Sequence, residues 1–176
     1  VHLTMTSEWD TYKWRPLTDG KSLVDESGFM WKTAKQVEKN AKLKELRAEI
    51  CAQVDRALSL GLKPSHLDNH MGSLYGIETG RFELLELTLS LAGEYGLPFR
   101  FPGSFTEVQF NNTMLDINID KSMIEMVFGK VVAFAKQQGV AIPDYLMPNE
   151  WNEPQTQSYE QFREYLYDLY ASIPEG

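Results

Sequence analysis

Short strand-like segments alternate with long amphipathic segments along this chain, and this alternation restricts the folds that are open to it. The strand-like segments are 1–6, 65–70, 97–101 and, less regularly, 140–146. The segments with helical periodicity are 35–60, 80–95, 120–138 and the residues that follow Ser158. Strands that alternate with helices of this length are typical of parallel βα units. We therefore predict an α/β fold.

The clearest helix prediction covers residues 35–60. Its apolar residues recur every three or four positions, and Lys and Glu occupy the other faces. These apolar residues are Leu43, Leu46, Ile50, Val54, Ala57 and Leu58. Gly61 provides the helix end, and Pro64 precedes the next strand. Cys51 falls within this pattern, so we expect it in the core rather than as a nucleophile. Because it is the single cysteine, an intrachain disulfide and a thiolate zinc cluster are excluded.

The remaining helix signals are local. Asp120 is a plausible N-cap of the helix through Gln138, and Ser158 with Gln161 has the pattern of a capping box. Pro143 weakens the strand prediction for 140–146, since proline cannot donate to a ladder. Residues 7–34 are predicted to be irregular and are rich in aromatic side chains. These include Trp9, Tyr12, Trp14, Phe29 and Trp31.

Composition excludes some classes of partner. A chain of 176 residues with 43% hydrophobic residues can bury one sizeable core. Its net charge of −8 argues against a nucleic-acid partner, because phosphate backbones are bound by basic surfaces. No stretch approaches the ~20 apolar residues of a membrane span.

All three histidines lie in two of the strand-like segments. In 65–70, alternation puts His66, Asp68 and His70 on one face of the strand, and His2 lies in segment 1–6. In parallel α/β folds, functional groups gather at the carboxyl ends of strands, where His70 lies. This placement indicates a metal or acid/base site. The alternative is a set of unrelated histidines with ordinary hydrogen bonds.

Geometry restricts which histidines share one ion. His66 and His70 are about 13 Å apart along an extended strand, whereas two nitrogen ligands of one zinc lie within about 4 Å. We therefore predict that the ligands are His2 and His70, one from each segment. His66 lies deeper and is interpreted as a core or hydrogen-bonding histidine. Asp68 is either a third ligand or an outer-sphere partner of a ligand.

The segment Val1–Ser7 with Glu8 and Trp9, together with Pro64–His70, resembles the YdjC-like (ChbG/HpnK) carbohydrate deacetylases. The resemblance implies a distorted or incomplete (β/α) barrel that removes acetyl groups from N-acetylated sugars. It also implies one divalent ion, magnesium or zinc, held by His2 and His70. Many members continue the second motif with further histidines, where this chain has Met71-Gly72, so we expect a different substrate pocket.

In that family, a third ligand and the catalytic base come from an Asp-Asp-Phe-Gly motif, and a His-Pro dipeptide follows later. Neither motif occurs in residues 1–176. We therefore expect residues 1–176 to be an internal part of a single catalytic domain that lacks its N-terminal strand motif and C-terminal strands. On this reading, the 176 residues alone are catalytically silent.

The resemblance also suggests roles for other residues. Asp68 is an outer-sphere residue or a base, and Arg100 orients carboxylates, meets substrate or forms only a surface ion pair. Residues predicted to contact an N-acetylated sugar or oligosaccharide are His66, Trp9, Tyr12 and Trp14, and Trp31 is a further candidate for stacking. The alternative for the aromatic residues is packing within their own loop. A cytoplasmic location and a homodimer are further expectations. The alternative functions are a non-catalytic sugar-binding or structural relative, and another metal-dependent hydrolase or isomerase on a similar barrel.

Overall fold

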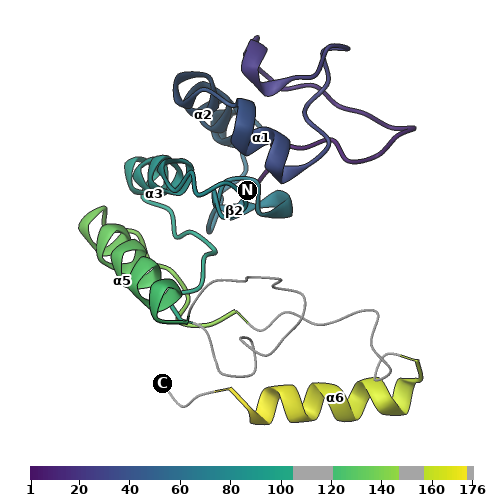
Figure 1. The fold of residues 1–176 in the computed structure, drawn as a ribbon, viewed down its shortest axis with the longest axis vertical. Coiled ribbons are helices and arrows are strands. Elements are labelled where there is room, and N and C mark those ends of the chain that lie inside the picture. The colour runs from purple at the N-terminus through teal and green to yellow at the C-terminus, as the bar shows by residue number, and fades with distance from the viewer. Residues whose placement is uncertain (105–120, 147–156, 174–176) are drawn as a thin grey trace. The chain divides into compact units, whose positions relative to one another are not determined.

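The computed structural model describes residues 1–104, 121–146 and 157–173 (Figure 1). The chain forms two units, Val1–Ser104 with Ile117–Asp144, and Phe105–Asp116 with Tyr145–Gly176. The first unit holds the strands β1 (His2–Leu3) and β2 (Asp68–Asn69) and the 3₁₀ helices η1 (Lys21–Leu23) and η2 (His70–Gly72). Its α-helices are α1 (Ala34–Asn40), α2 (Leu43–Ser59), α3 (Glu83–Tyr95) and α5 (Lys121–Gln137). The second unit holds α6 (Tyr159–Ala171).

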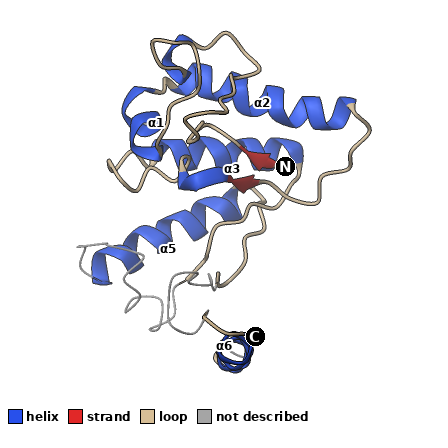
Figure 2. Cartoon of the chain, turned by 90° about the vertical axis from the view of Figure 1, so that its right-hand side faces the viewer, coloured by secondary structure: helices blue, strands red, loops and turns tan. Residues whose placement is uncertain are grey.

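The two strands are parallel, as the βα pattern predicts, with His2 opposite Asp68 (Figure 2). The predicted strand 97–101 contributes one parallel bridge, between Phe99 and Leu67. The backbone N–H of Phe99 in turn donates to the carbonyl of Ala141, in the predicted segment 140–146. The segments therefore lie side by side in chain order, but the regular strands are shorter than predicted. Proline accounts for part of this, because Pro98 and Pro143 have no N–H to donate.

The prediction of one helix over 35–60 is wrong, because the structure has two helices with a break at Ala41 and Lys42. Both residues have extended backbone conformations. Distant groups satisfy the backbone at the break. The N–H of Lys42 donates to the Ser22 hydroxyl, and the Arg81 guanidinium donates to the carbonyls of Glu38 and Ala41. Periodicity cannot report such partners, since they lie about twenty to forty residues away in the sequence.

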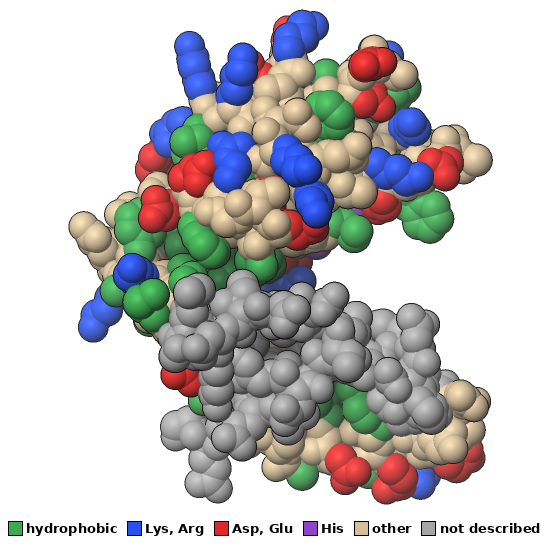
Figure 3. All heavy atoms as spheres, viewed as in Figure 1, with side chains coloured by type: hydrophobic (Ala, Val, Ile, Leu, Met, Phe, Trp, Pro, Cys, Tyr) green, Lys and Arg blue, Asp and Glu red, His purple; other side chains and the backbone are tan. Residues whose placement is uncertain are grey.

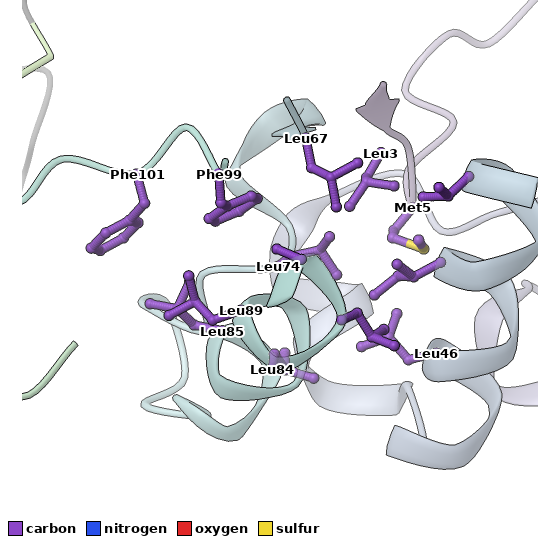
Figure 4. Packing of buried hydrophobic residues seen from close by; sticks show 14 of the residues in the cluster. Leu3, Met5, Leu46, Leu67, Leu74, Leu84, Leu85, Leu89, Phe99 and Phe101 are labelled. Carbon is purple, nitrogen blue, oxygen red and sulfur yellow. The ribbon is translucent and has the colours of Figure 1, made fainter. Parts of the chain in front are cut away.

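The hydrophobic core lies between the strands and helices α2 and α3 (Figure 4). Leu3 and Met5 extend from β1 and its continuation toward Leu46 of α2. Of the predicted α2 stripe, the four central residues are buried, namely Leu46, Ile50, Val54 and Ala57. Leu43 and Leu58 at its ends are exposed. Cys51 packs against the core but is only partly buried.

The later helices match their predictions closely. α3 ends at Gly96, which adopts the left-handed conformation with φ 64° that glycine favours. α2 packs against α3, and α3 packs against α5. The Ser158 hydroxyl caps α6 by accepting from the N–H of Gln161. The predicted N-cap Asp120 lies outside the described residues. Among the residues that the structure describes, no helix is both long and apolar enough to cross a membrane.

Two glutamates of α2 hold the long aromatic segment 7–34 against the core through hydrogen bonds. Buried Glu49 accepts hydrogen bonds from the backbone N–H groups of Leu17 and Thr18 and from the Thr18 hydroxyl. Glu45 accepts from the N–H and the hydroxyl of Ser22. The segment is largely irregular, as predicted, apart from η1 and isolated bridges. Figure 3 shows one face of the first unit, on which Lys and Arg side chains alternate with Asp and Glu side chains.

Candidate active site

The site begins with a cross-strand pair. The register that sets His2 opposite Asp68 brings their side chains to the same face of the sheet. The Nδ1 atom of His2 lies 2.7 Å from Oδ2 of Asp68. The other carboxylate oxygen, Oδ1, accepts from Nε of Arg100 at 2.7 Å and from the backbone N–H of Asn69 at 2.7 Å. Asp68 therefore joins His2 to Arg100.

His70 reaches the same place because it leaves the strand. β2 ends at Asn69, and His70 begins the 3₁₀ turn η2, in which Met71 has the left-handed φ of 55°. Such a backbone costs a non-glycine residue about 1–2 kcal/mol, so the surrounding structure must hold this turn. Nδ1 of His70 lies 3.0 Å from Nε2 of His2. The predicted convergence of the two imidazoles to within about 4 Å is confirmed.

A fifth side chain, Glu8, completes the chain of contacts and was not predicted to have a role. Its Oε1 atom lies 3.0 Å from Nε2 of His70. The polar groups therefore follow one another from Arg100 through Asp68, His2 and His70 to Glu8. One sequence signal pointed to Glu8: it continues the even-numbered positions that share a strand face with His2.

The two carboxylates determine which imidazole nitrogens carry hydrogen. An ionised carboxylate only accepts, so Nδ1 of His2 and Nε2 of His70 donate to Asp68 and Glu8 respectively. The lone pairs of Nε2 of His2 and Nδ1 of His70 then face each other at 3.0 Å. Two facing lone pairs repel unless a proton or a metal cation lies between them. The donor chemistry therefore fits two ligands of one metal ion.

These two nitrogens are an incomplete ligand set. Within the described part of the chain, no group of three or more His, Cys, Asp and Glu side chains is arranged to hold a metal ion. Asp68 points one oxygen to His2 and the other to Arg100 and the Asn69 N–H. Its contacts are those of a residue that orients a ligand.

The electrostatics of Asp68 agree with an orienting role. Burial by itself raises the pKa of this carboxyl. The hydrogen bonds from Arg100, the Asn69 N–H and His2 outweigh that effect and hold the pKa below its ordinary value. A carboxylate in this state binds a proton weakly, which suits orientation better than general base catalysis. Nearby, burial raises the pKa of Tyr75 to about 12, and its hydroxyl donates to the Arg100 carbonyl.

Arg100 forms an ion pair with Asp68. An ion pair was one of the three roles predicted for this arginine. Its side chain is 49% exposed, whereas that of Asp68 is 15% exposed. The guanidinium therefore extends from solvent to a carboxylate of the site. In this structure, the carboxylate that Arg100 orients belongs to β2.

His66 was interpreted as a deep histidine of the core or as a hydrogen-bonding one; the structure contradicts the first interpretation and agrees with the second. Its side chain is exposed, and its Nδ1 atom contacts the hydroxyl of the adjacent Ser65 at 2.9 Å. The adjacent residue, Leu67, faces the opposite way and is buried. The predicted role of His66 in substrate binding stays a prediction.

The aromatic side chains of 7–34 differ in exposure. Trp9 and Tyr12 are 63% and 76% exposed, so their rings are open to solvent. Trp14 is partly buried, and its ring lies 6.4 Å from that of Tyr12. Its indole N–H is buried and has no partner within the described part of the chain. Trp31 has a structural contact, since its indole N–H donates to the carbonyl of Ser22. Trp9 and Tyr12 are therefore the rings most able to meet a ligand.

Gln53 of α2 supports β1 beside the site. Its side-chain amide accepts from the N–H of Thr4 and donates to the carbonyl of Thr4, as a neighbouring strand would. The Thr4 hydroxyl in turn donates to the carbonyl of His2. The segment that carries His2 is thus fixed from α2.

Two curated relatives show which proteins this chain is similar to. A carbohydrate deacetylase from Thermus thermophilus is 39% identical over 97 residues, which are 55% of this chain and 34% of that protein. A carbohydrate deacetylase from Clostridium beijerinckii is 31% identical over 131 residues, which are 71% of this chain and 49% of that protein. The chain thus spans about a third to a half of the length of these curated relatives.

A solved structure shares the fold. It is that of a protein from Enterococcus faecalis V583 described as a cellobiose-phosphate cleavage protein, with a TM-score of 0.62 and 24% sequence identity. The match covers 98% of this chain and 54% of that one. The family model of the YdjC-like proteins matches residues 1–176, the whole of the chain. The chain belongs to the YdjC-like protein family.

Proposed function

We propose that this chain is part of a metal-dependent carbohydrate deacetylase with a (β/α) barrel-like architecture. The observation that carries the metal dependence is the pair of imidazole nitrogens that face each other at 3.0 Å, each ring held from behind by a carboxylate. The names of the curated relatives support the substrate class and the reaction. The parallel order of the strands supports the barrel.

His2 and His70 would hold the metal ion through Nε2 and Nδ1 respectively. Imidazole ligands favour zinc and similar transition metals over magnesium, which prefers carboxylate and water oxygens. When bound, a divalent ion polarises a carbonyl and lowers the pKa of water, which are the requirements of amide hydrolysis. Asp68 keeps the hydrogen of His2 on Nδ1, and Arg100 keeps that carboxylate ionised and in place.

The proposed substrate is an N-acetylated sugar or oligosaccharide. The exposed rings of Trp9 and Tyr12 offer apolar faces on which the C–H groups of a sugar ring can stack. Arg100, half-exposed at the edge of the site, can donate to sugar oxygens with the guanidinium hydrogens that Asp68 does not use. A cytoplasmic location and a homodimer stay predictions.

Metal binding tests the proposal directly. Calorimetric titration of the complete protein with Zn²⁺ and, separately, with Mg²⁺ should show one site with higher affinity for Zn²⁺. His2→Ala and His70→Ala should each abolish binding, since one imidazole remains. His66→Ala is the matched control, because it also removes a histidine but should leave the affinity unchanged.

Activity is measured in the complete protein, as metal-dependent release of acetate from N-acetylglucosamine oligomers. His70→Ala should remove this activity. Equal loss of metal from the His66 and His70 variants, with folding intact, would show that the ligand pair is misassigned. A wild-type protein that binds neither ion would refute metal dependence.

A further inference from the structure

Glu8 lies beyond the end of β1, and its contact with His70 mirrors the contact of Asp68 with His2. Oε1 of Glu8 is 3.0 Å from Nε2 of His70, and Oδ2 of Asp68 is 2.7 Å from Nδ1 of His2. The free nitrogen of each ring points to the other ring. Each histidine therefore has one carboxylate behind it and one nitrogen turned inward.

We infer that Glu8 is the positioning residue of His70: it holds the hydrogen on Nε2 and thereby turns the lone pair of Nδ1 toward His2. The metal-binding part of this inference rests on the proposed function. The effect of Glu8 on the imidazole itself does not, because it concerns a hydrogen bond that exists without metal.

The partners of Glu8 differ from those of structural glutamates in the same unit. Both carboxylate oxygens of Glu38 and of Glu49 accept from backbone N–H groups and threonine hydroxyls or other side chains. They anchor loops. Glu8 instead accepts from an imidazole through Oε1, while its buried Oε2 atom has no hydrogen-bond partner among the residues that the structure describes. The contact of Glu8 is therefore directed to the imidazole of His70 and not to the backbone of a loop.

Loss of Glu8 has a specific chemical consequence. With no acceptor at Nε2, the neutral His70 ring gains more by carrying its hydrogen on Nδ1. That hydrogen then donates to Nε2 of His2, which is 3.0 Å away. Both inward nitrogens are engaged in this hydrogen bond, and a cation must break it before it can bind. Glu8 prevents this tautomer by supplying the better acceptor on the other side.

Imidazole NMR tests the tautomer without metal. Long-range ¹H–¹⁵N spectra of the ¹⁵N-histidine-labelled chain at pH 8 distinguish nitrogens that carry hydrogen from those that do not. In the metal-free wild type, Nε2 of His70 should carry hydrogen. In Glu8→Ala, Nε2 should lose it and Nδ1 should carry it. Glu8→Gln should restore the wild-type pattern, because its amide oxygen still accepts. An unprotonated Nε2 in the wild type, or the wild-type pattern in Glu8→Ala, would overturn the inference.

Zn²⁺ affinity then tests the consequence for metal binding. Glu8→Ala should bind Zn²⁺ about 10–100-fold more weakly, as for other outer-sphere partners of metal-bound histidine, and Glu8→Gln should recover most of the loss. Asp10→Ala is the matched control: it removes one negative charge from the same segment, where an exposed ion pair joins Asp10 to Lys32. Its affinity should change by about threefold or less.

The outcomes separate this inference from the proposed function. If the wild type binds no Zn²⁺ but Glu8→Ala still moves the hydrogen to Nδ1, metal dependence fails and the positioning role stands. If the wild type binds Zn²⁺ and Glu8→Ala binds it equally well, the role of Glu8 in metal binding is refuted. If Glu8→Gln loses binding as completely as His70→Ala, Glu8 is itself a ligand, and the positioning role is refuted.

Discussion

The side chain of Gln53 forms two hydrogen bonds with the backbone of Thr4, as a neighbouring strand would. The variant Gln53→Glu tests how much these bonds contribute to the stability of the fold. The wild-type amide accepts from the N–H of Thr4 at 2.9 Å and donates to its carbonyl at 2.8 Å. The same NH₂ group donates to Oε1 of Glu49 at 2.9 Å. A glutamate has almost the same shape but, when ionised, it cannot donate.

The expected loss follows from these contacts. The variant keeps the bond from the Thr4 N–H and loses both donated bonds. The bond to the Thr4 carbonyl contributes about 0.5–1.5 kcal/mol and the bond to the charged Glu49 about 1.5–3 kcal/mol. Repulsion between the new carboxylate and buried Glu49 adds to this sum until one of the two binds a proton. We expect Gln53→Glu to lower the free energy of unfolding by about 3–5 kcal/mol at pH 7, a large part of the total of about 5–15 kcal/mol.

Urea denaturation followed by circular dichroism measures this loss. The repulsion raises the pKa of the new carboxyl group in the folded state, so the folded variant binds more protons than the unfolded one. The deficit should therefore shrink as the pH falls from 7 toward 4. Gln137→Glu makes the same charge change at an exposed position of α5 and should cost no more than about 1 kcal/mol. A Gln53→Glu deficit below about 0.5 kcal/mol at pH 7, or one that acid does not reduce, would refute the reasoning.

Two further predictions concern backbone conformation and pH. Gly76 and Gly80 both have positive φ, 70° and 75°, but a Cβ atom at Gly76 would overlap the backbone carbonyl of Arg81, whereas nothing lies within 4 Å of one at Gly80. Gly80→Ala should therefore cost about 1–2 kcal/mol and Gly76→Ala about 2–5 kcal/mol by thermal denaturation, and equal costs would contradict this. Hydrogen bonds from the N–H and then the hydroxyl of Ser22 hold the pKa of Glu45 below its ordinary 4.5. The unfolded state thus binds a proton first, so the stability that Glu45 provides over Glu45→Gln is present above about pH 4.5 and should disappear as the pH falls through the lowered pKa. A difference that is the same at pH 3 and pH 7 would show that this carboxylate contributes nothing through its charge.

Local sequence patterns were sufficient to predict where the later helices lie along the chain. α3, α5 and α6 begin and end close to their predicted positions because periodicity and end signals such as Gly96 and Ser158 act within a few residues. The meeting of His2 and His70 was also predictable. His66 and His70 are too far apart along one extended strand to share an ion, so the pair had to take one histidine from each of two neighbouring strands.

Features that depend on partners far away in the sequence were decided only by the tertiary structure. The break before α2 is stabilised by Ser22 and Arg81, and the segment of His2 is held by Gln53, which lies 49 residues from Thr4. No local pattern specifies these contacts.

The hydrogen bonds within the site also depend on residues that are far apart in the sequence. Alternation along a strand predicted His66 and His70 on one face, but β2 is only Asp68–Asn69. His70 begins the turn η2 after it, and His66 lies before it and is exposed. Glu8 contacts His70 across 62 residues of sequence, and the direction of that one hydrogen bond determines which nitrogen faces His2. The sequence by itself determined which residue types reach the site. The tertiary structure decided how their hydrogen bonds are directed, because that depends on the positions of all the partners together.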